Sequence, residues 1–220
     1  MKINQNEVLG YLGYRGLKIE ADIRNLIEAC SSEILNLARP KNVYEIYRLE
    51  SEADQIRLQE SFLSFKSHDL QNHLGDSSYC AVMAVTLGSE VDKKIDYLAQ
   101  SDLLKAMVMD ATASTAIEAY GNEVCDLIRV LASKNGFFLT ERYSPGYGDF
   151  PLESQQQLLN LLNAYSKIGL TVTKSSLLIP RKSITAIVGL TKTPPVNAPV
   201  NKRCSDCKMV NCRLRREPKE

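Results

Sequence analysis

A loop spanning residues 142–151 gathers the residue types that could bind a small polar ligand. Its sequence, RYSPGYGDFP, begins with Arg142, whose planar guanidinium has five donors and suits a carboxylate or a phosphate. Ser144-Pro145-Gly146 is typical of a tight turn, because proline fixes its own φ and glycine permits angles closed to other residues. Backbone groups and two tyrosines would then face a ligand, although an ordinary surface turn explains the same spacing.

A helix is predicted to begin where this loop ends. Asp149 stands at the position of an N-cap, and Pro151 and Glu153 would fall in the first turn. We therefore expect Asp149 to close the loop by capping that helix.

Three cysteines close to the end of the sequence form a candidate metal site. Cys204, Cys207 and Cys212 lie in KRCSDCKMVNCRLRR, where neighbouring cations would lower the thiol pKa values and two thiols at C-x-x-C spacing can hold one ion. Zinc and an Fe–S cluster held by three cysteines are both compatible with this spacing, and free reduced thiols are the alternative. The candidates for a fourth ligand are Cys30, Cys80, Cys125, Asp206, a second chain or a substrate.

The remaining candidate residues have simpler interpretations. Cys30, Cys80 and Cys125 lie in apolar periodic segments and are expected to be core thiols. His68 and His73 are five positions apart, a spacing that does not place both on one helix face, so we expect surface residues. The glycine-rich segment 10–16 lacks the preceding strand and the Lys-Ser/Thr of a phosphate loop and is predicted to be a turn.

The composition indicates a globular protein and argues against several kinds of partner. The chain has 220 residues, 44% hydrophobic and 24% charged, enough to bury a core without disulfides. Its 27 Lys and Arg against 26 Asp and Glu give a net charge of +1, which offers no basic field for nucleic acid. The first twenty residues lack an apolar signal segment and no 18 apolar residues run uninterrupted, so we expect a cytoplasmic protein that does not enter a membrane.

The elements that would position these residues follow from hydrophobic periodicity. Residues 142–151 would join a short strand to a helix, and Glu118 would lie on a long helix capped by Asp102. We expect helices at 19–37, 69–74, 89–100, 102–132 and 152–165, and strands at 42–50, 79–87 and 137–140. A hairpin-like pair is expected at 170–174 and 183–190, and the residues before 19 should be irregular or form a short turn.

The mixed order of helices and strands predicts an α+β fold, with a largely antiparallel twisted sheet covered by helices. We expect one domain over residues 1–192, with an N-terminal part to about residue 85 and a ligand-binding part over about 86–192. A Pro-rich linker would follow at 193–203, and a Cys-rich basic tail at 204–220.

Three segments resemble the activation domain of cobalamin-dependent methionine synthase, which binds S-adenosylmethionine. Residues 142–147 resemble its Arg-x-x-x-Gly-Tyr signature, and residues 178–186, LIPRKSITA, resemble its proline, serine and strand segment. Glu118-Ala119-Tyr120 is similar to its Glu-Ala-aromatic segment. The resemblance covers roughly residues 86–190, while the earlier residues look like those of small stand-alone relatives.

The resemblance implies roles for five residues. Arg142 would pair with the methionyl carboxylate of S-adenosylmethionine, and Glu118 would face its ammonium or sulfonium region. The backbone at Ser144 and Gly146 would contact the adenosine, and Tyr147 would lie near the methyl group and the corrin face. The family's C-terminal tyrosines have no counterpart after Leu190, and its N-terminal acidic ligand residue is not matched here.

The resemblance also implies an accessory function rather than a complete enzyme. The chain has no room for homocysteine, folate and cobalamin modules, so it would act in trans on the cobalamin of a separate methionine synthase or corrinoid protein. A flavodoxin-like protein is the candidate electron donor. Two alternatives remain open: a metal or Fe–S redox protein that activates a corrinoid protein, and an independent S-adenosylmethionine-dependent methyltransferase.

Overall fold

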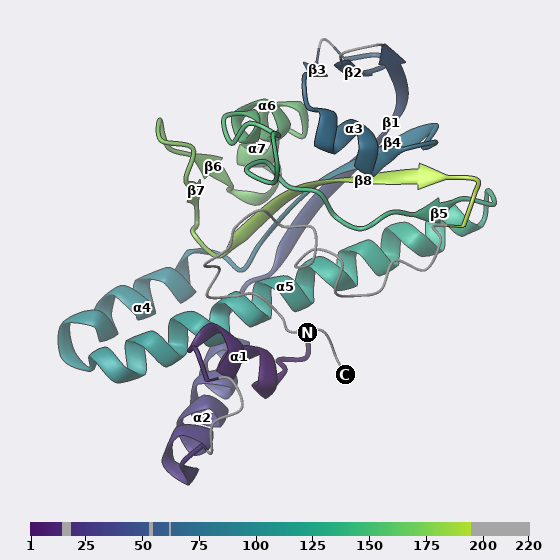
Figure 1. Ribbon diagram of the computed structural model, residues 1–220. Helices are drawn as coiled ribbons and strands as arrows, with labels where there is room; N and C mark the ends of the chain where they lie inside the picture. Colours follow the sequence, from purple (N-terminus) through teal and green to yellow (C-terminus); the bar gives the residue numbers. More distant parts are fainter. Residues whose placement is uncertain (15–18, 53–54, 62, 195–220) are drawn as a thin grey trace.

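A six-stranded antiparallel sheet forms the centre of the protein in the computed structural model, which describes residues 1–14, 19–52, 55–61 and 63–194 (Figure 1). The strand order is β3-β2-β1-β4-β8-β5, and every neighbouring pair is antiparallel. The strands are β1 (Lys41–Glu52), β2 (Gln55–Leu58), β3 (Ser64–Phe65), β4 (Tyr79–Thr86), β5 (Phe138–Leu139) and β8 (Ser183–Thr191).

The central strand β4 is buried on both of its faces. Ala81, Met83 and Val85 contribute to the core on one side of the sheet, whereas Val82 and Ala84 contribute to the core on the other. Successive side chains of a strand point to opposite faces, so a strand covered on both sides must be apolar throughout. This explains the continuous apolar run that predicted β4.

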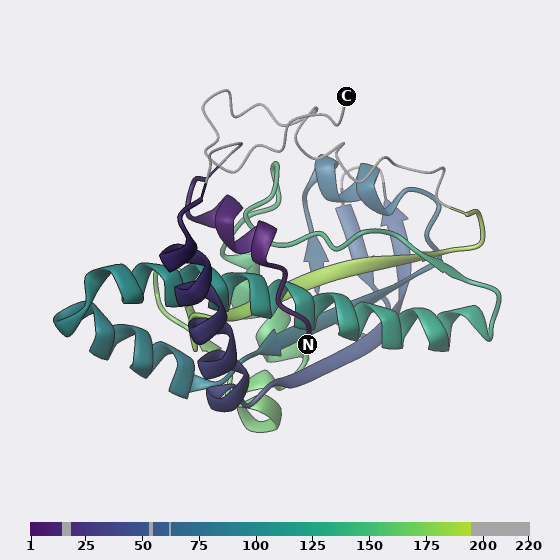
Figure 2. The ribbon, with the colours of Figure 1, turned by 90° about the horizontal axis from the view of Figure 1, so that it is seen from below.

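Four helices lie on one side of the sheet, with α5 next to the strands and the other three packed against α5 (Figure 2). They are α1 (Gln5–Tyr11), α2 (Ala21–Leu37), α4 (Ser89–Ser101) and α5 (Leu103–Ser133). The longest, α5, begins where the side chain of Asp102 accepts a hydrogen bond from the amide of Lys105 at 3.0 Å, as predicted. Its buried small residues, Ala111, Ala113 and Ala116, allow neighbouring elements to approach closely.

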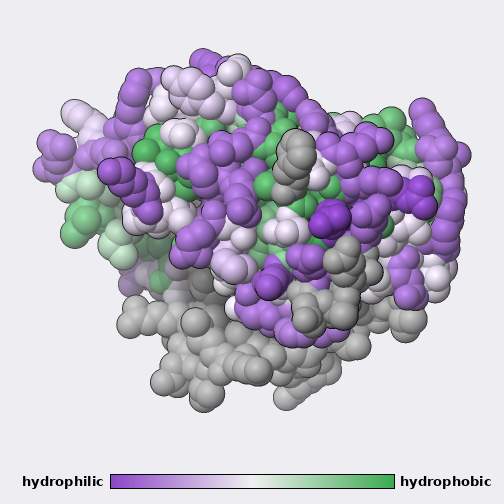
Figure 3. Space-filling view, turned by 90° about the horizontal axis from the view of Figure 1, so that it is seen from above, coloured by the Kyte–Doolittle hydropathy of each residue, from purple (hydrophilic) through white to green (hydrophobic). Residues whose placement is uncertain are grey.

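The opposite face carries shorter helices and the segment that follows β5. The helices are α3 (His68–Leu74), α6 (Ser154–Leu161) and α7 (Ala164–Ile168). Phe150, Leu158, Leu162 and Leu170 are fully buried beneath them. Figure 3 views this side of the molecule and shows mainly hydrophilic side chains, with apolar atoms visible between them.

The observed sheet and its helices confirm the predicted α+β class and the largely antiparallel sheet. The predicted helices at 19–37, 69–74, 89–100 and 102–132 and the strands at 42–50, 79–87 and 137–140 are confirmed within a few residues. None of the described helices combines the length and the apolar composition needed to cross a lipid bilayer.

The predicted hairpin between residues 170–174 and 183–190 was wrong. The strand β6 (Thr171–Val172) pairs with β7 (Leu178–Ile179) instead, and β8 lies between β4 and β5 in the main sheet. Each of the two-residue strands β6 and β7 falls below the length at which alternation of apolar residues is detectable.

Other boundaries also differ from those expected. The predicted helix at 152–165 is divided, because Asn163 adopts a left-handed conformation with φ of 52° and ends the first segment before α7 begins. The N-terminal residues form α1, where the side chain of Asn4 accepts from the amide of Asn6. Two short strands, β2 and β3, occupy the stretch for which only polar character and one short helix were predicted.

Candidate functional site

Arg142 lies where the chain runs along the edge of the sheet. After β5, Tyr143 exchanges two backbone hydrogen bonds with Ile187 of β8, at 2.9 and 2.8 Å. Successive side chains of an extended segment point to opposite faces of a sheet. Arg142 therefore faces α5, and Tyr143 packs into the core beneath α3 and α6.

The structure brings Arg142 and Glu118 into direct contact. Nη2 of Arg142 donates to Oε2 of Glu118 at 2.6 Å and to Oδ1 of Asn122 at 3.0 Å. The Arg142 side chain is only 12% exposed, whereas that of Glu118 is 40% exposed. A mostly buried cation thus lies beside an anion that solvent reaches, and the two charges are close enough to meet one zwitterionic molecule.

A stripe of polar residues on α5 receives this arginine and a second cation. Nζ of Lys182 lies 2.8 Å from Oδ1 of Asp110 and 2.9 Å from the hydroxyl of Ser114. The members, spaced by four positions and called here the α5 polar stripe, are Asp110, Ser114, Glu118 and Asn122. Residues four apart share one helix face, so this spacing on a largely apolar helix is a signal that the sequence analysis missed.

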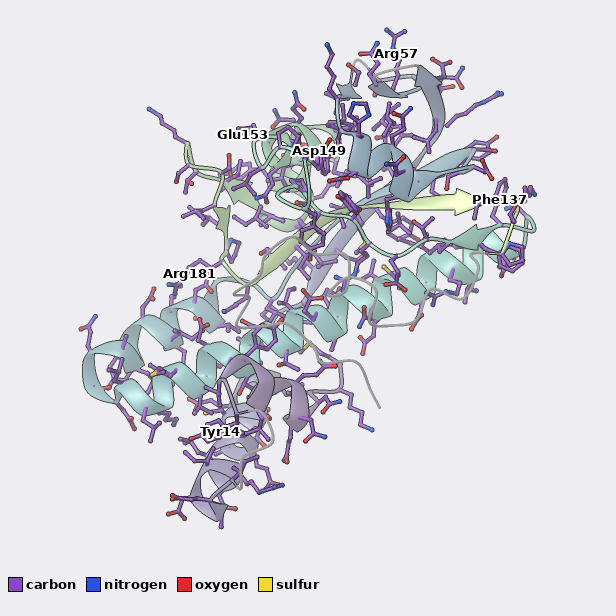
Figure 4. All side chains as sticks on the ribbon, in the orientation of Figure 1. Tyr14, Arg57, Phe137, Asp149, Glu153 and Arg181 are labelled. Atoms are coloured by element: carbon purple, nitrogen blue, oxygen red, sulfur yellow. The ribbon has the colours of Figure 1, made fainter. Side chains whose placement is uncertain are left out.

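The beginning of β8 is anchored on the same side of the sheet. Arg181, labelled in Figure 4, donates its backbone amide to Asp92 at 2.6 Å, and its guanidinium donates to Asp96 at 2.6 Å. Together with Lys182 on the α5 polar stripe, these contacts fix the segment that carries the predicted Pro180 and Ser183 motif against α4 and α5.

The loop after Arg142 forms the turn that its sequence predicts. The amide of Tyr147 donates to the carbonyl of Ser144 at 3.1 Å, and Gly146 has φ of 90°. Proline second and a glycine with positive φ third are the features of a type II turn. The amide of Gly146 donates to the carbonyl of Phe150 at 2.8 Å, so the loop is closed on itself by its own backbone.

The predicted role of Asp149 as the N-cap of the following helix was wrong. Helix α6 begins at Ser154. Asp149, labelled in Figure 4, instead accepts from the amides of His68 and Asp69 at 2.8 and 3.1 Å and from the hydroxyl of Ser67. These bonds satisfy the first amides of α3, a helix far away in sequence. Sequence spacing alone favoured the nearer helix end.

The link between the loop and α3 is reciprocal. Asp69 accepts from the amide of Asp149 at 3.1 Å, while the Asp149 side chain binds the end of α3. The hydroxyl of Ser67, with the His68 and Asp69 amides, lowers the pKa of Asp149 below its ordinary value. Gly148 lies between the two, with φ of 52°, where an added Cβ would fall 2.6 Å from Oη of Tyr143 and closer still to the Asp69 carboxylate.

Tyr143 connects the loop to the side of the sheet that carries α3, away from α5. Its ring lies 4.9 Å from the ring of His73 and 5.7 Å from that of Tyr147, centroid to centroid. Burial, together with the negative charges of Asp69 and Asp149, raises the pKa of Tyr143 to about 12, so its hydroxyl stays protonated. Tyr147 is 43% exposed and packs edge-on against Tyr143.

The five residues predicted to bind a ligand thus fall into two groups. Arg142 and Glu118 touch each other on the α5 side of the sheet. Ser144, Gly146 and Tyr147 follow in the same loop, with Tyr147 resting on Tyr143.

Two open hollows lie along α5, beside the α5 polar stripe. One, of about 490 Å³, lies between the N-terminal segment Lys2–Gln5 and the helix and includes Asn122 in its wall. The other, of about 530 Å³, is lined by residues 10–13 and by residues of α4 and α5, including Asp110 and Ser114. Asp110, Ser114 and Asn122 therefore border these hollows, and Arg142 and Glu118 line neither of the two.

The predicted metal-binding cysteines, Cys204, Cys207 and Cys212, lie outside the described residues. Within the described part of the chain, no cluster of three or more His, Cys, Asp or Glu side chains could hold a metal ion. Cys30, Cys80 and Cys125 are free thiols inside the core, which confirms that prediction. Burial raises the pKa of Cys30 to about 11 and that of Cys80 to about 12, which disfavours the thiolate form that metals bind.

The comparisons with known proteins agree with one another. A family model described as "Vitamin B12 dependent methionine synthase, activation domain" matches residues 18–194. The fold resembles that of the MetH reactivation domain, whose crystal structure has AdoHcy bound, with a TM-score of 0.65 and 16% sequence identity. The structural match covers 85% of this chain and 73% of that one. No curated protein sequence matches the chain.

Proposed function

Because the chain belongs to the family of activation domains of vitamin B12-dependent methionine synthase, we propose that it binds S-adenosylmethionine and supports the reductive remethylation of cobalamin held by another protein. The contact between Arg142 and Glu118 is the observation that carries this proposal. It supplies one anion-binding and one cation-binding group within a single site. The methionyl end of S-adenosylmethionine carries a carboxylate and an ammonium group a few ångström apart.

The two charged residues have distinct tasks in this proposal. Arg142 binds the ligand carboxylate through its planar fork, for which a lysine ammonium is a poor substitute. Glu118, which solvent reaches, binds the ammonium or the region of the sulfonium. The ligand thereby takes over charges that the protein otherwise neutralises within its own pair, so the mostly buried Arg142 is not left without a partner.

The loop from Ser144 to Tyr147 completes the proposed site. Its backbone at Ser144 and Gly146 contacts the adenosine, and the turn geometry holds that backbone in one shape. Tyr147 extends an exposed ring near the reactive methyl group and the partner's corrin. The protein contributes orientation, because the methyl group must lie on the line between the sulfur and its acceptor.

The proposed partner is a separate cobalamin-binding methionine synthase or similar corrinoid protein. Its cobalamin supplies a nucleophilic cobalt after a one-electron reduction, and a flavodoxin-like protein is the proposed electron donor. The methyl group leaves the sulfonium with no proton to remove, so the chain needs no general base. Its class is an accessory protein for a methyltransferase.

A reconstitution assay tests the proposed partnership. A cobalamin-dependent methionine synthase lacking its own activation domain is converted to its inactive cob(II)alamin form and mixed with this protein, S-adenosylmethionine and a one-electron chemical reductant. We expect the visible absorbance of methylcobalamin to appear only when all components are present. Equal methylation without this protein, or with its Arg142→Ala variant, would contradict the proposal.

A further inference from the structure

The guanidinium of Arg142 lies directly against the backbone of α5 at Gly121. This residue is buried and stands in the middle of a 31-residue helix, where glycine is among the poorest helix formers. A glycine at such a position calls for a local reason, either close packing or function.

The surroundings of Gly121 identify that reason. A Cβ added there would lie 3.1 Å from Cζ of Arg142 and closer than 3.0 Å to its Nη1, a separation that Cβ atoms essentially never show in proteins. The next atom, Cδ1 of Ile184, would lie 3.5 Å away, an ordinary contact. The guanidinium thus occupies the space that a side chain at position 121 would need, and no approaching backbone accounts for the glycine.

The residues on either side of Gly121 hold the same guanidinium in place. Glu118, three positions before it, accepts from Nη2 at 2.6 Å, and Asn122 accepts from the same nitrogen at 3.0 Å. Positions 118, 121 and 122 share one face of the helix. The backbone at Gly121 sets how closely the guanidinium approaches α5, and the side chains of Glu118 and Asn122 set its rotation.

We infer that Gly121 and Asn122 are positioning residues, which hold the Arg142 guanidinium against α5 in the orientation that receives an anionic ligand group. Asn122 also lines the hollow of about 490 Å³ beside the N-terminal segment. The ligand part of this inference rests on the proposed function, whereas the positioning itself does not.

Gly121→Ala tests whether Gly121 is needed to position Arg142. If it is, the variant should fold but bind the ligand more weakly; if it is not, the variant should fold and bind as the wild type does. Alanine improves helix propensity, and the end of the flexible arginine side chain can move away, so the variant should fold. We expect its affinity for S-adenosylhomocysteine to fall about tenfold or more, because the guanidinium is displaced. The matched control is Gly10→Ala in α1, where an added Cβ meets no atom within 4 Å and affinity should stay unchanged.

Two further variants show whether the effect passes through the arginine. In an Arg142→Ala background, Gly121→Ala should cause no additional loss of affinity. Asn122 is exposed, so Asn122→Ala should fold, and we expect it to lower affinity about threefold through one lost hydrogen bond. An additional loss in the arginine-free background, or an unchanged affinity in Asn122→Ala, would contradict the roles assigned to these residues.

A crystal structure of Gly121→Ala decides the positioning without any ligand. We expect the guanidinium to have left its contacts with Glu118 and Asn122. A guanidinium that keeps both contacts, or an affinity equal to that of the wild type, would overturn the inference. If the wild type fails to bind S-adenosylhomocysteine, the proposed function fails, and this crystal structure alone then decides whether Gly121 positions Arg142.

Discussion

At the scale of single residues, the site depends on side chains that reach elements distant in sequence. Arg142 crosses to α5, and Asp149 crosses to the first turn of α3. These two residues fix the ends of the loop from opposite sides of the sheet. The loop geometry is therefore set by long-range polar contacts as much as by its own turn.

Acidification should weaken the attachment of the loop through Asp149. Its pKa is lowered in the folded protein, mainly by the hydrogen bond from Ser67, so the folded state binds this proton less readily than the unfolded state does. The resulting stabilisation is complete above about pH 5 and is lost as the pH falls below about 4. Urea unfolding of the wild type and Asp149→Asn should therefore show free energies that differ at pH 7 and approach each other as the pH falls below about 4. Asp76 has an exposed carboxylate, so Asp76→Asn serves as the control variant. A difference in the free energy of unfolding between the wild type and Asp149→Asn that stays constant across this pH range would refute the argument.

Gly148→Ala should destabilise the protein more than Gly13→Ala. Both glycines have positive φ, so both substitutions carry the conformational cost of alanine in that region. Only at position 148 does the added Cβ also meet the Asp69 carboxylate and the Tyr143 hydroxyl. We expect an extra loss of about 1–3 kcal/mol in the free energy of unfolding, measured by chemical denaturation. Equal losses in the free energy of unfolding for the two variants would show that the loop accommodates the added Cβ at position 148 without a measurable loss of stability.

At the scale of elements, α5 organises the site. Its apolar face packs on the sheet, while the α5 polar stripe meets Lys182 at Asp110 and Ser114 and meets Arg142 two turns further along, at Glu118 and Asn122. The helix thereby sets the spacing between the segment before β8 and the loop after β5. Those two segments contain two of the three family-like motifs, and Glu118 on α5 belongs to the third.

The N-cap of α5 should contribute measurably to stability. Asp102 accepts from the Lys105 amide, and removing this acceptor in Asp102→Ala should lower the free energy of unfolding by about 1 kcal/mol. Asp102→Asn keeps an acceptor and should restore most of the loss, which separates the hydrogen bond from the charge. Thermal denaturation followed by circular dichroism measures both variants. A loss as large in Asp102→Asn would assign the effect to charge instead.

Periodicity predicted the long elements, and it failed where an element is short or its partner is distant. Helix α5 and strand β4 have many apolar positions in phase, so their patterns are unambiguous. The pairing of β6 with β7 and the position of β8 depend on tertiary contacts that no local pattern contains. Strand β3 has only two residues, too few for alternation to be detected, whereas the four residues of β2, QIRL, do alternate and were missed.

The site, like the fold, was predictable only where a local sequence pattern determines the structure. The type II turn follows from proline and glycine in sequence. The family resemblance alone suggested that Arg142 and Glu118 serve one ligand, and their direct contact was not predicted. The attachment of Asp149 to α3 and the close approach at Gly121 arise from how the sheet and helices pack. The attachment of Asp149 has no local signature. The glycine at position 121 within a predicted helix and the four-residue spacing of the α5 polar stripe were signals in the sequence that the prediction did not use.

At the scale of the whole molecule, the sheet separates two cores, and the candidate site lies at its edge between them. The core under α1, α2, α4 and α5 contains Cys30 and Cys125, and the opposite core contains Cys80. The loop after Arg142 touches both sides. Loosening of either core should therefore reach the site through Arg142 or Tyr143.

The three core cysteines should be unreactive in the native protein. Burial raises all three thiol pKa values, so little thiolate forms at pH 8 and reagents have poor access. A variant with Cys204, Cys207 and Cys212 replaced by serine isolates them. We expect no rapid alkylation by iodoacetamide when it is folded and three modified thiols after unfolding, counted by mass spectrometry. Rapid modification of a core thiol in the folded variant would contradict the described burial.

The central claim is that S-adenosylmethionine binds where Arg142 meets Glu118, and titration calorimetry tests it most directly. We predict that the wild type binds S-adenosylmethionine and that Arg142→Ala weakens the affinity about tenfold to a hundredfold, since a charge-assisted hydrogen-bonded pair is lost. Arg142→Lys should recover only part of this loss, because it lacks the planar fork. Absence of binding by the wild type, or equal affinity in Arg142→Ala, would contradict the claim.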